Sequence, residues 1–357
     1  MMGTTHAQPG RLGNPDETLA SDPRTDPRLV AALEPFGLGG HGEPLPLDAS
    51  APTDQLVAFC NAAEAGFQQV FDAMCAELAP VTGVERSTET ITGVDGNEIT
   101  LYIHRPSEPG DDLPGILHIH GGGMVILTAA DVNYARWRDH LAAEGLVVVG
   151  VEYRNGAGVL GPHPFPAGLD DCSSALDWMD AHRGDLGIST IVVSGESGGG
   201  NLTIATTLKA KQDGRLAAID GVYAQCPYIS GMWAQKPAEI VSMTENDEYF
   251  IGTPIMGVMA AVYDPSGEHA RNPLAWPYHA SVDDLSGLPP HVISVNELDP
   301  LRDEGLAYAR RLLRAGVSVV SRTVNGTCHA GDLLLEGPMN DVYRASLRDV
   351  VGFAEAL

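Results

Sequence analysis

Hydrophobic and polar residues follow one another along this chain in patterns that predict an irregular arm, a long helix and then a series of strands and helices. Residues 1 to about 51 are rich in Pro, Gly and Asp and show little periodicity, so we expect an arm that wraps the rest of the protein. Between Pro52 and Pro80, apolar residues recur at spacings of three and four, which predicts an amphipathic helix. Its apolar face consists of Leu56, Phe59, Cys60, Ala63, Phe67, Val70, Phe71 and Met74.

Eight short segments rich in β-branched residues predict strands. They lie at about 86–91, 98–105, 115–120, 146–152, 190–194, 220–225, 291–296 and 317–324. Helix-like stretches separate most of the later strands, near 134–144, 168–183, 198–213, 304–315 and 340–356. This alternation predicts an α/β fold with a mostly parallel sheet and helices on both faces. Only the turn 94–97 joins the first two strands, which indicates an antiparallel hairpin at one edge.

One segment, 227–263, interrupts this alternation after the sixth strand. It is rich in large apolar side chains, namely Met232, Trp233, Met243, Tyr249, Phe250, Ile255, Met256 and Met259. We expect this insert to pair with the N-terminal helix as a lid over the C-terminal edge of the sheet. The predicted organisation is therefore an N-terminal arm and cap helix, 1–85, and an α/β core, 86–357, that carries the cap insert.

The composition describes a folded, acidic protein. Of 357 residues, 44% are hydrophobic, and 47 acidic against 21 basic side chains give a formal net charge of −26. This length suits one large core with an accessory element, at roughly 100 to 200 residues per domain. Only three lysines occur, Lys209, Lys211 and Lys236. Nucleic acid and anionic lipid are therefore not expected as partners, because binding them depends on neutralising phosphates with Lys and Arg.

Targeting features and cysteines favour a cytoplasmic protein with reduced thiols. The first thirty residues lack the apolar run of a signal peptide. The strongly apolar stretches, such as 146–151, fall far short of the ~18 residues needed to cross a bilayer, so no membrane span is expected. The five cysteines lack paired spacing, which fits buried thiols better than a disulfide framework: Cys60, Cys75, Cys172, Cys226 and Cys328.

A serine in the pentad Gly195-Glu196-Ser197-Gly198-Gly199 is the leading candidate for chemistry. The pentad stands between a predicted strand and a predicted helix, and this setting is what makes a G-x-S-x-G pattern informative. Glycines tolerate the crowding of so sharp a turn, which lets the serine hydroxyl project above the sheet. We therefore interpret Ser197 as a nucleophile rather than as part of a structural glycine-rich turn.

A second motif, His120-Gly121-Gly122-Gly123, directly follows the third predicted strand. Backbone N–H groups of glycines have no side chain in the way, so they can point at an oxygen that acquires negative charge. The alternative is a flexible loop. Both this motif and the serine turn stand at the C-terminal ends of strands and in the chain order that acyl-transfer sites use, which favours an oxyanion hole.

A nucleophilic serine needs a base, and the base needs an acid that holds its tautomer. In hydrolases with such a serine turn, the order along the chain is serine, acid, histidine. Four of the twelve histidines follow Ser197. His291 lies inside a predicted strand and His269 and His279 precede it, whereas His329 lies in the loop after the eighth strand. We therefore predict His329 as the base.

The acid should emerge just beyond the seventh strand, where Glu297, Asp299 and Asp303 are all available. Asp299 sits in the loop before Pro300, a residue suited to a turn or to the first position of a helix. Asp303 and Glu304 look instead like first-turn carboxylates that face a helix N-terminus. On position alone we favour Asp299 over Asp303.

Two further motifs are rejected as ligand sites. Residues 156–161 form a G-x-G-x-x-G after a strand, but three prolines follow where a dinucleotide site needs a helix N-terminus. His118 and His120 share one face of a strand, as a metal pair would, but no third ligand stands at a telling spacing. We expect neither a cofactor nor a metal.

With these residues identified, the chain resembles the hormone-sensitive-lipase-like (bacterial family IV) carboxylesterases of the α/β-hydrolase fold. The resemblance runs through most of the chain and rests on 120–124, 195–202 (GESGGGNL), 272–281 (NPLAWPYHAS), 296–305 (NELDPLRDEG) and His329. The chain departs from the family where Tyr153-Arg154-Asn155-Gly156 replaces the commoner Tyr-Arg-Leu-Ala-Pro-Glu run. Glu196 and Gly198 also stand where Asp and Ala are frequent. Neither departure removes a catalytic group.

The resemblance implies an α/β-hydrolase fold with a helical cap, and a triad of Ser197 as nucleophile, Asp299 as acid and His329 as base. Three backbone N–H groups would form the oxyanion hole, those of Gly122, Gly123 and Gly198. The implied reaction is hydrolysis of small carboxylic esters, either short-chain acyl esters or a lactone. Two alternatives stay open, an amidase or peptidase on the same triad and a non-catalytic receptor of the same fold. An exposed eighth strand would offer an edge on which a second copy could pair to form a homo-oligomer.

Overall fold

Eight strands form one sheet in the computed structural model, which describes residues 8–42, 44–108, 110 and 112–357. Their spatial order is β1-β2-β4-β3-β5-β6-β7-β8. Their bounds are β1 Val84–Thr92, β2 Glu98–Pro106, β3 Leu113–Ile119, β4 Val147–Val151, β5 Ile188–Glu196, β6 Gly221–Gln225, β7 His291–Asn296 and β8 Val319–Val324. β2 pairs antiparallel with β1 and β4, and the other neighbours pair parallel. The mostly parallel sheet and its edge hairpin are thus confirmed.

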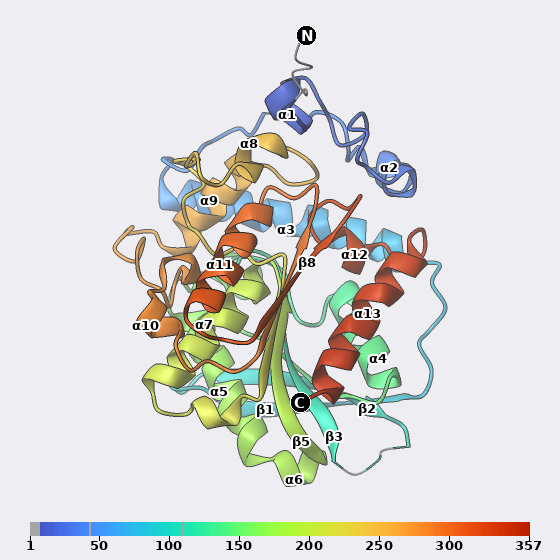
Figure 1. Ribbon diagram of the computed structural model, residues 1–357, viewed down its shortest axis with the longest axis vertical. Coiled ribbons are helices and arrows are strands. Elements are labelled where there is room, and N and C mark those ends of the chain that lie inside the picture. The colour runs from blue at the N-terminus through green and yellow to red at the C-terminus, as the bar shows by residue number, and fades with distance from the viewer. Residues whose placement is uncertain (1–7, 43, 109, 111) are drawn as a thin grey trace, which may run out of the picture.

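Helices cover both faces of this sheet (Figure 1). One face carries α5 (Ala167–Ala181), α7 (Gly198–Gln212) and α11 (Arg302–Arg314), and the other carries α4 (Val132–Ala143) and α13 (Asn340–Glu355). Shorter helices are α6 (Arg183–Leu186), α10 (Val282–Leu285) and α12 (Gly331–Leu334), with 3₁₀ turns at Glu34–Phe36, Leu216–Ala218 and Pro277–His279. The five helices expected after the third strand are confirmed. None of the described helices combines the length and the apolar character that a membrane crossing needs.

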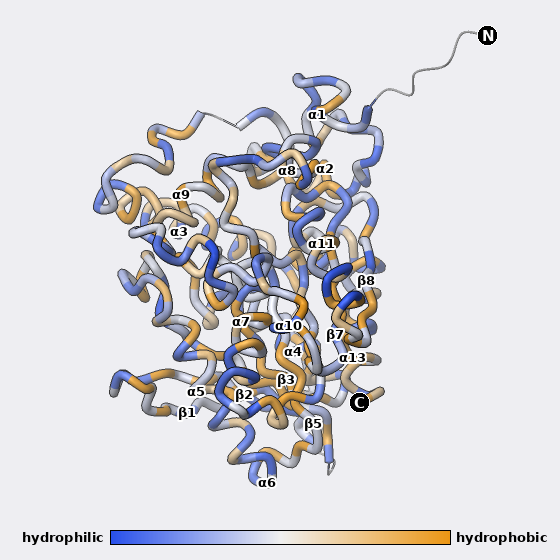
Figure 2. Tube along the Cα trace, turned by 60° about the vertical axis from the view of Figure 1, so that its left-hand side comes forward, coloured by the Kyte–Doolittle hydropathy of each residue, from blue (hydrophilic) through white to orange (hydrophobic). Residues whose placement is uncertain are grey.

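The burial of each strand follows from its place in the sheet. Every residue of β4 and β6 is buried, because helices cover both faces of a central strand. At the edges, β1 exposes most of its polar residues, and Val320 of β8 is 59% exposed. Figure 2 shows the hydrophobic stretches along the inner strands and hydrophilic segments at the periphery, for example around α6.

Segments from two distant parts of the chain lie over the C-terminal edge of the sheet (Figure 1). They comprise α1 (Gly10–Gly13), α2 (Pro27–Leu33) and α3 (Thr53–Cys75) of the N-terminal part, and α8 (Ser242–Glu245) and α9 (Thr253–Tyr263) of the insert after β6. α3 and α9 pack against each other. Arg24 of the arm and Arg302 at the start of α11 both bind the Glu245 carboxylate. The first seven residues of the arm lie outside the described residues.

Candidate active site

Ser197 stands on a sharp turn between β5 and α7. Its backbone adopts φ 56° and ψ −118°, a conformation that is unfavourable for a residue with a Cβ atom. Three hydrogen bonds hold it there, from Ser197 N to Gln225 O (2.9 Å) and to Ser197 O from Tyr228 N (3.0 Å) and Asn201 N (3.1 Å). The flanking glycines are needed because a Cβ atom on Gly195 or Gly199 would overlap the carbonyl oxygen of Ile119.

Asp299 and His329 meet at the same edge of the sheet, although 30 positions separate them. His329 Nδ1 lies 2.8 Å from Asp299 Oδ2, and the other carboxylate oxygen accepts a hydrogen bond from Leu301 N at 2.8 Å. Asp299 is fully buried. With its proton on Nδ1, the imidazole donates to this carboxylate and keeps Nε2 free as a base.

The other carboxylates that follow β7 point elsewhere. Glu297 accepts from Gly326 N (2.9 Å), and Asp303 accepts from Ser242 N (2.9 Å) and pairs with Arg302. Glu304 is fully buried, and its two oxygens accept from the backbone N–H groups of residues 229 and 230. Burial raises the pKa of Glu304 to about 8, although these hydrogen bonds oppose the shift. The structure thus places Asp299, rather than Asp303, against the imidazole of His329.

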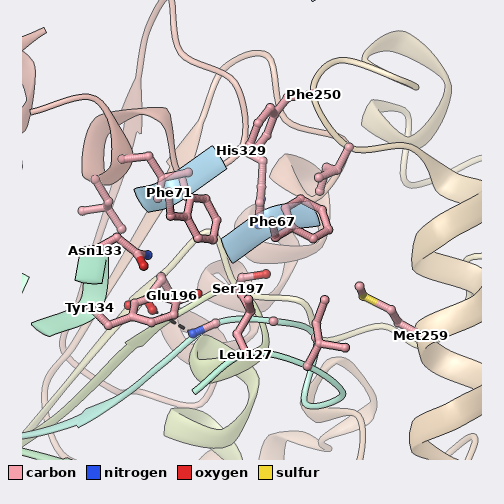
Figure 3. A pocket seen from close by; sticks show the side chains of 18 of the residues that line it. Phe67, Phe71, Leu127, Asn133, Tyr134, Glu196, Ser197, Phe250, Met259 and His329 are labelled. Carbon is pink, nitrogen blue, oxygen red and sulfur yellow. Dashed lines mark hydrogen bonds between the residues drawn. The ribbon is translucent and has the colours of Figure 1, made fainter. Parts of the chain in front are cut away.

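Ser197 and His329 line one cavity (Figure 3). No hydrogen bond joins the Ser197 hydroxyl to His329 Nε2 among the described residues. Such contacts are often long before substrate binds and tighten only in the reacting complex. Most other lining side chains are apolar, and seven of the lining residues come from the segments above the sheet, including Phe67 and Phe71 of α3 and Met259 of α9.

The loop after β3 reaches the same cavity with glycines in unusual conformations. Gly122 has φ 103° and Gly123 has φ 64°, which L side chains rarely adopt. The loop passes so close to α7 that a Cβ atom on Gly198 would stand 2.6 Å from Gly123 N. Within the described part of the chain, the N–H groups of Gly122, Gly123 and Gly198 donate to no other protein group. Two of these donors belong to residues that line the cavity, and the third belongs to the residue that follows Ser197.

Comparisons of the whole chain with known proteins agree with the geometry of this site. A family model for the alpha/beta hydrolase fold matches residues 116–332. The chain belongs to the α/β-hydrolase family. The structure of brefeldin A esterase, described as a bacterial homologue of human hormone-sensitive lipase, aligns to this hydrolase with a TM-score of 0.95. That alignment has 50% identity and covers 98% of each chain.

Relatives identified by sequence are also esterases. Carboxylesterase NlhH of Mycobacterium tuberculosis is 35% identical over 252 residues, covering 68% of this hydrolase and 73% of the relative. An arylesterase of Saccharolobus solfataricus is 31% identical over 268 residues, covering 74% and 82%. The expected membership of the hormone-sensitive-lipase-like esterases and the expected fold are confirmed. These relatives do not favour an amidase or a receptor.

The remaining histidines after Ser197 take structural positions in this hydrolase. His291 lies inside β7, where burial lowers its pKa to about 4 and Nδ1 contacts Pro289 O. His279 Nε2 contacts Ser230 O at 3.0 Å. His269 packs against Phe165 in a tilted arrangement, with ring centroids 4.7 Å apart and the ring planes at 58°. None of the three is placed to accept a proton from Ser197.

One group of described side chains has the ligand types and spacing of a metal site. The ligand atoms of Cys226, Asp299 and His329 lie within 4.8 Å of one another. A metal would have to replace the proton between His329 and Asp299, and it would need a thiolate. Burial and the nearby Asp299 carboxylate raise the pKa of the Cys226 thiol well above its usual range, so the thiol stays protonated. These residues suit a proton-transfer pair better than a metal.

Sequence reasoning missed the role of Glu196, which directly precedes the nucleophile candidate. One Glu196 oxygen accepts from Gly121 N (2.8 Å), and the other lies 3.1 Å from His118 Nε2. The side chain therefore ties the serine turn on β5 to the glycine loop after β3. The same contact accounts for the position of His118, whose Nε2 faces the Glu196 carboxylate rather than a metal. The signal in the sequence was an acidic residue placed beside a serine turn.

Glu64 was also missed, and it anchors α3 to the core. This buried carboxylate accepts from Leu127 N (2.7 Å) and Val159 N (2.9 Å), while Asn61 accepts from Gly158 N (2.7 Å). The G-x-G-x-x-G segment thus presents its N–H groups to a helix of the same chain. The available signal was a charged residue on the apolar face of the predicted helix. Its effect is to hold Phe67 of α3 over the cavity.

Glu336 fastens the segment that follows His329 and α12 to α4. It accepts from Arg136 Nε (2.6 Å) and lies 3.0 Å from His140 Nε2. Burial raises the pKa of this carboxyl, but the hydrogen bonds from His140 and Arg136 outweigh it and lower the pKa to about 2 from 4.5. A lowered pKa in the folded state contributes stability above pH 4.5, and this contribution is lost as the pH falls toward 2.

Glu336→Gln is therefore expected to lower the free energy of unfolding at pH 7 by on the order of 2 kcal/mol. The difference from the unmodified chain should shrink steadily below pH 4.5, because the native carboxylate is then protonated as well. Urea unfolding at pH 7, 4 and 3 measures it. Glu355→Gln, which changes an exposed carboxylate on α13, serves as the control. An equal deficit at all three pH values would contradict the electrostatic explanation.

Proposed function

We propose that this hydrolase cleaves carboxylic esters through an acyl-enzyme formed on Ser197. Asp299 and His329 serve as acid and base, and the N–H groups of Gly122, Gly123 and Gly198 form the oxyanion hole. The observation that carries the proposal is the 2.8 Å contact between His329 and Asp299 at the wall of the cavity that Ser197 also lines. The esterases among its relatives support the same reaction.

Two half-reactions follow from these roles. The Ser197 hydroxyl attacks the ester carbonyl while His329 Nε2 takes its proton, and the oxyanion accepts hydrogen bonds from the three glycine N–H groups. The same imidazole then protonates the departing alcohol. Water, activated by His329, attacks the acyl-enzyme and releases the acid. Asp299 stays ionised throughout and stabilises the imidazolium that forms in each half-reaction.

The cavity favours uncharged, largely apolar substrates. Its described lining contains no Lys or Arg, and its acidic member is Glu196. Anionic esters would lose hydration there without gaining a cationic partner. The largely apolar lining suits a short-chain acyl ester or a lactone, and one relative is named for the ester it hydrolyses, brefeldin A. We propose both classes as substrates.

We also propose that residues 1–85 and the insert 227–263 act together as a cap on the core, 86–357. Phe67 and Phe71 come from the first segment and Met259 from the second, and all three line the cavity. Because the two segments pack against each other through α3 and α9, a change in either would alter the shape that the substrate meets. Substrate choice would then depend on the cap, and the chemistry on the core.

A matched pair of substrates tests the proposed reaction. A p-nitrophenyl ester and the p-nitroanilide of the same short acid differ only in the atom that leaves with the nitrophenyl ring. We expect hydrolysis of the ester and none of the anilide. Release of p-nitrophenol or p-nitroaniline is followed by absorbance. Comparable rates on both would assign an amidase. Binding of the ester without turnover would assign a receptor.

A further inference from the structure

Asn296, the last residue of β7, lies between the two loops that carry Asp299 and His329. It is 2% exposed, and its side-chain amide makes three hydrogen bonds. Nδ2 donates to Thr327 Oγ1 (2.7 Å) and to Asp332 Oδ1 (2.8 Å), and Oδ1 accepts from Ala330 N (3.2 Å). One side chain on the strand that precedes the acid therefore holds the base-bearing loop on both sides of His329.

Other contacts also hold the base-bearing loop, such as Leu298 N to Thr327 O (3.0 Å), but the residue directly after His329 is strained. Between β8 and α12 it has no regular structure, and Ala330 adopts φ 52°, a left-handed conformation that is unfavourable for alanine. The His329 side chain itself has one recorded partner, Asp299. The amide of Asn296 supplies an acceptor at the strained residue and donors on either side of it. Its contacts keep the strained conformation populated.

The chemistry of the partners demands an amide at this position. The Thr327 hydroxyl gives its only proton to Val324 O, so it can only accept from residue 296. Asp332 is also an acceptor, and its second oxygen is already bound by the Ser346 hydroxyl. A carboxylate at 296 would face these two acceptors without a donor. Asparagine supplies two donors and one acceptor in the directions that the loop requires.

We propose that Asn296 is a positioning residue that sets the place of the His329 imidazole relative to Asp299 and Ser197. The proposal rests on the function assigned above, in which His329 is the base. Asn296 does not touch the cavity or the reacting atoms, so it acts only through the loop. A displacement of about 1 Å in such a group can lower turnover by about 10²-fold while substrate binding stays the same.

The experiment compares Asn296→Asp with Ser346→Ala. The first variant removes both donors at nearly constant volume. The second removes the hydroxyl that binds the far oxygen of Asp332 and leaves every contact of Asn296 in place. On a p-nitrophenyl ester, we expect Asn296→Asp to lower kcat by about 10²-fold with KM within about twofold, and Ser346→Ala to retain kcat within about threefold. Both variants are assayed at a temperature where far-ultraviolet circular dichroism shows them folded.

A second readout separates positioning from general loosening of the fold. The rate at which a fluorophosphonate labels Ser197 reports activation of the hydroxyl by His329, and it should fall in Asn296→Asp as kcat does. If Asn296→Asp does not fold, Thr327→Val, which removes one partner of the amide, should lower kcat and the labelling rate together by about tenfold. Unchanged kcat in the folded variant, or equal losses in Ser346→Ala, would overturn the proposal. Failure of the proposed function appears instead as full activity in Ser197→Ala.

Discussion

Ser197→Ala is expected to lower kcat on a p-nitrophenyl short-chain ester by at least about 10⁴-fold. The variant keeps the cavity and the three glycine donors but removes the oxygen that would form the acyl-enzyme. Residual activity should resemble that of water attacking an ester held in the oxyanion hole. Initial rates of p-nitrophenol release measure the loss, and stopped-flow absorbance would show that the burst from acyl-enzyme formation disappears.

Ser194→Ala is the matched control for that change. Ser194 lies three positions earlier on β5, is also buried (1% exposed, against 8% for Ser197), and its hydroxyl has no hydrogen-bond partner among the described residues. Removing it should leave kcat nearly unchanged. If Ser197→Ala retained the turnover of the unmodified enzyme, the nucleophile would have to be another group and the proposed mechanism would fail.

Asp299→Asn should lower kcat by about 10⁴-fold, whereas Asp303→Asn should retain most of it. An amide at 299 can present its NH₂ group to His329 Nδ1, which forces the proton onto Nε2 and leaves no base facing Ser197. Asp303 instead accepts from Ser242 N and pairs with Arg302, so it contributes to the packing of α11. Steady-state kinetics on the same ester, with KM and kcat determined separately, distinguish the two sites.

A double variant sharpens the second prediction. Because the three side chains act as one unit, Ser197→Ala combined with Asp299→Asn should be no slower than Ser197→Ala alone. Additive losses would mean that Asp299 acts outside the triad. Loss of turnover in Asp303→Asn with normal turnover in Asp299→Asn would reassign the acid.

Local patterns in the sequence accounted for the secondary structure well. The β-branched runs at 146–152 and 220–225 became the fully buried strands β4 and β6, and the apolar spacing of 52–80 became α3. These predictions succeed because helix and strand periods are properties of neighbouring residues. Their ends moved by a few residues, since the last turn or pair depends on hydrogen bonds outside the element.

The supporting contacts of the site were beyond the reach of such patterns. Glu196 binds Gly121, Glu64 binds Leu127, and Asn296 binds a loop more than thirty positions away. A single buried carboxylate or amide has no period, and its partner is either a backbone group that any residue type can supply or a side chain far away in the sequence. Sequence reasoning therefore identified the candidates for chemistry and overlooked the side chains that hold them.

The sequence by itself determined the order of the strands and helices along the chain, the serine on a turn between glycines, and the succession of serine, acid and histidine. These are local or ordinal properties that need no knowledge of distance. Only the tertiary structure decided which carboxylate after β7 faces His329, because Asp299 and Asp303 are close in sequence and differ in direction. It also decided the shape of the cavity, which depends on how α3 and α9 pack across residues far apart in the chain.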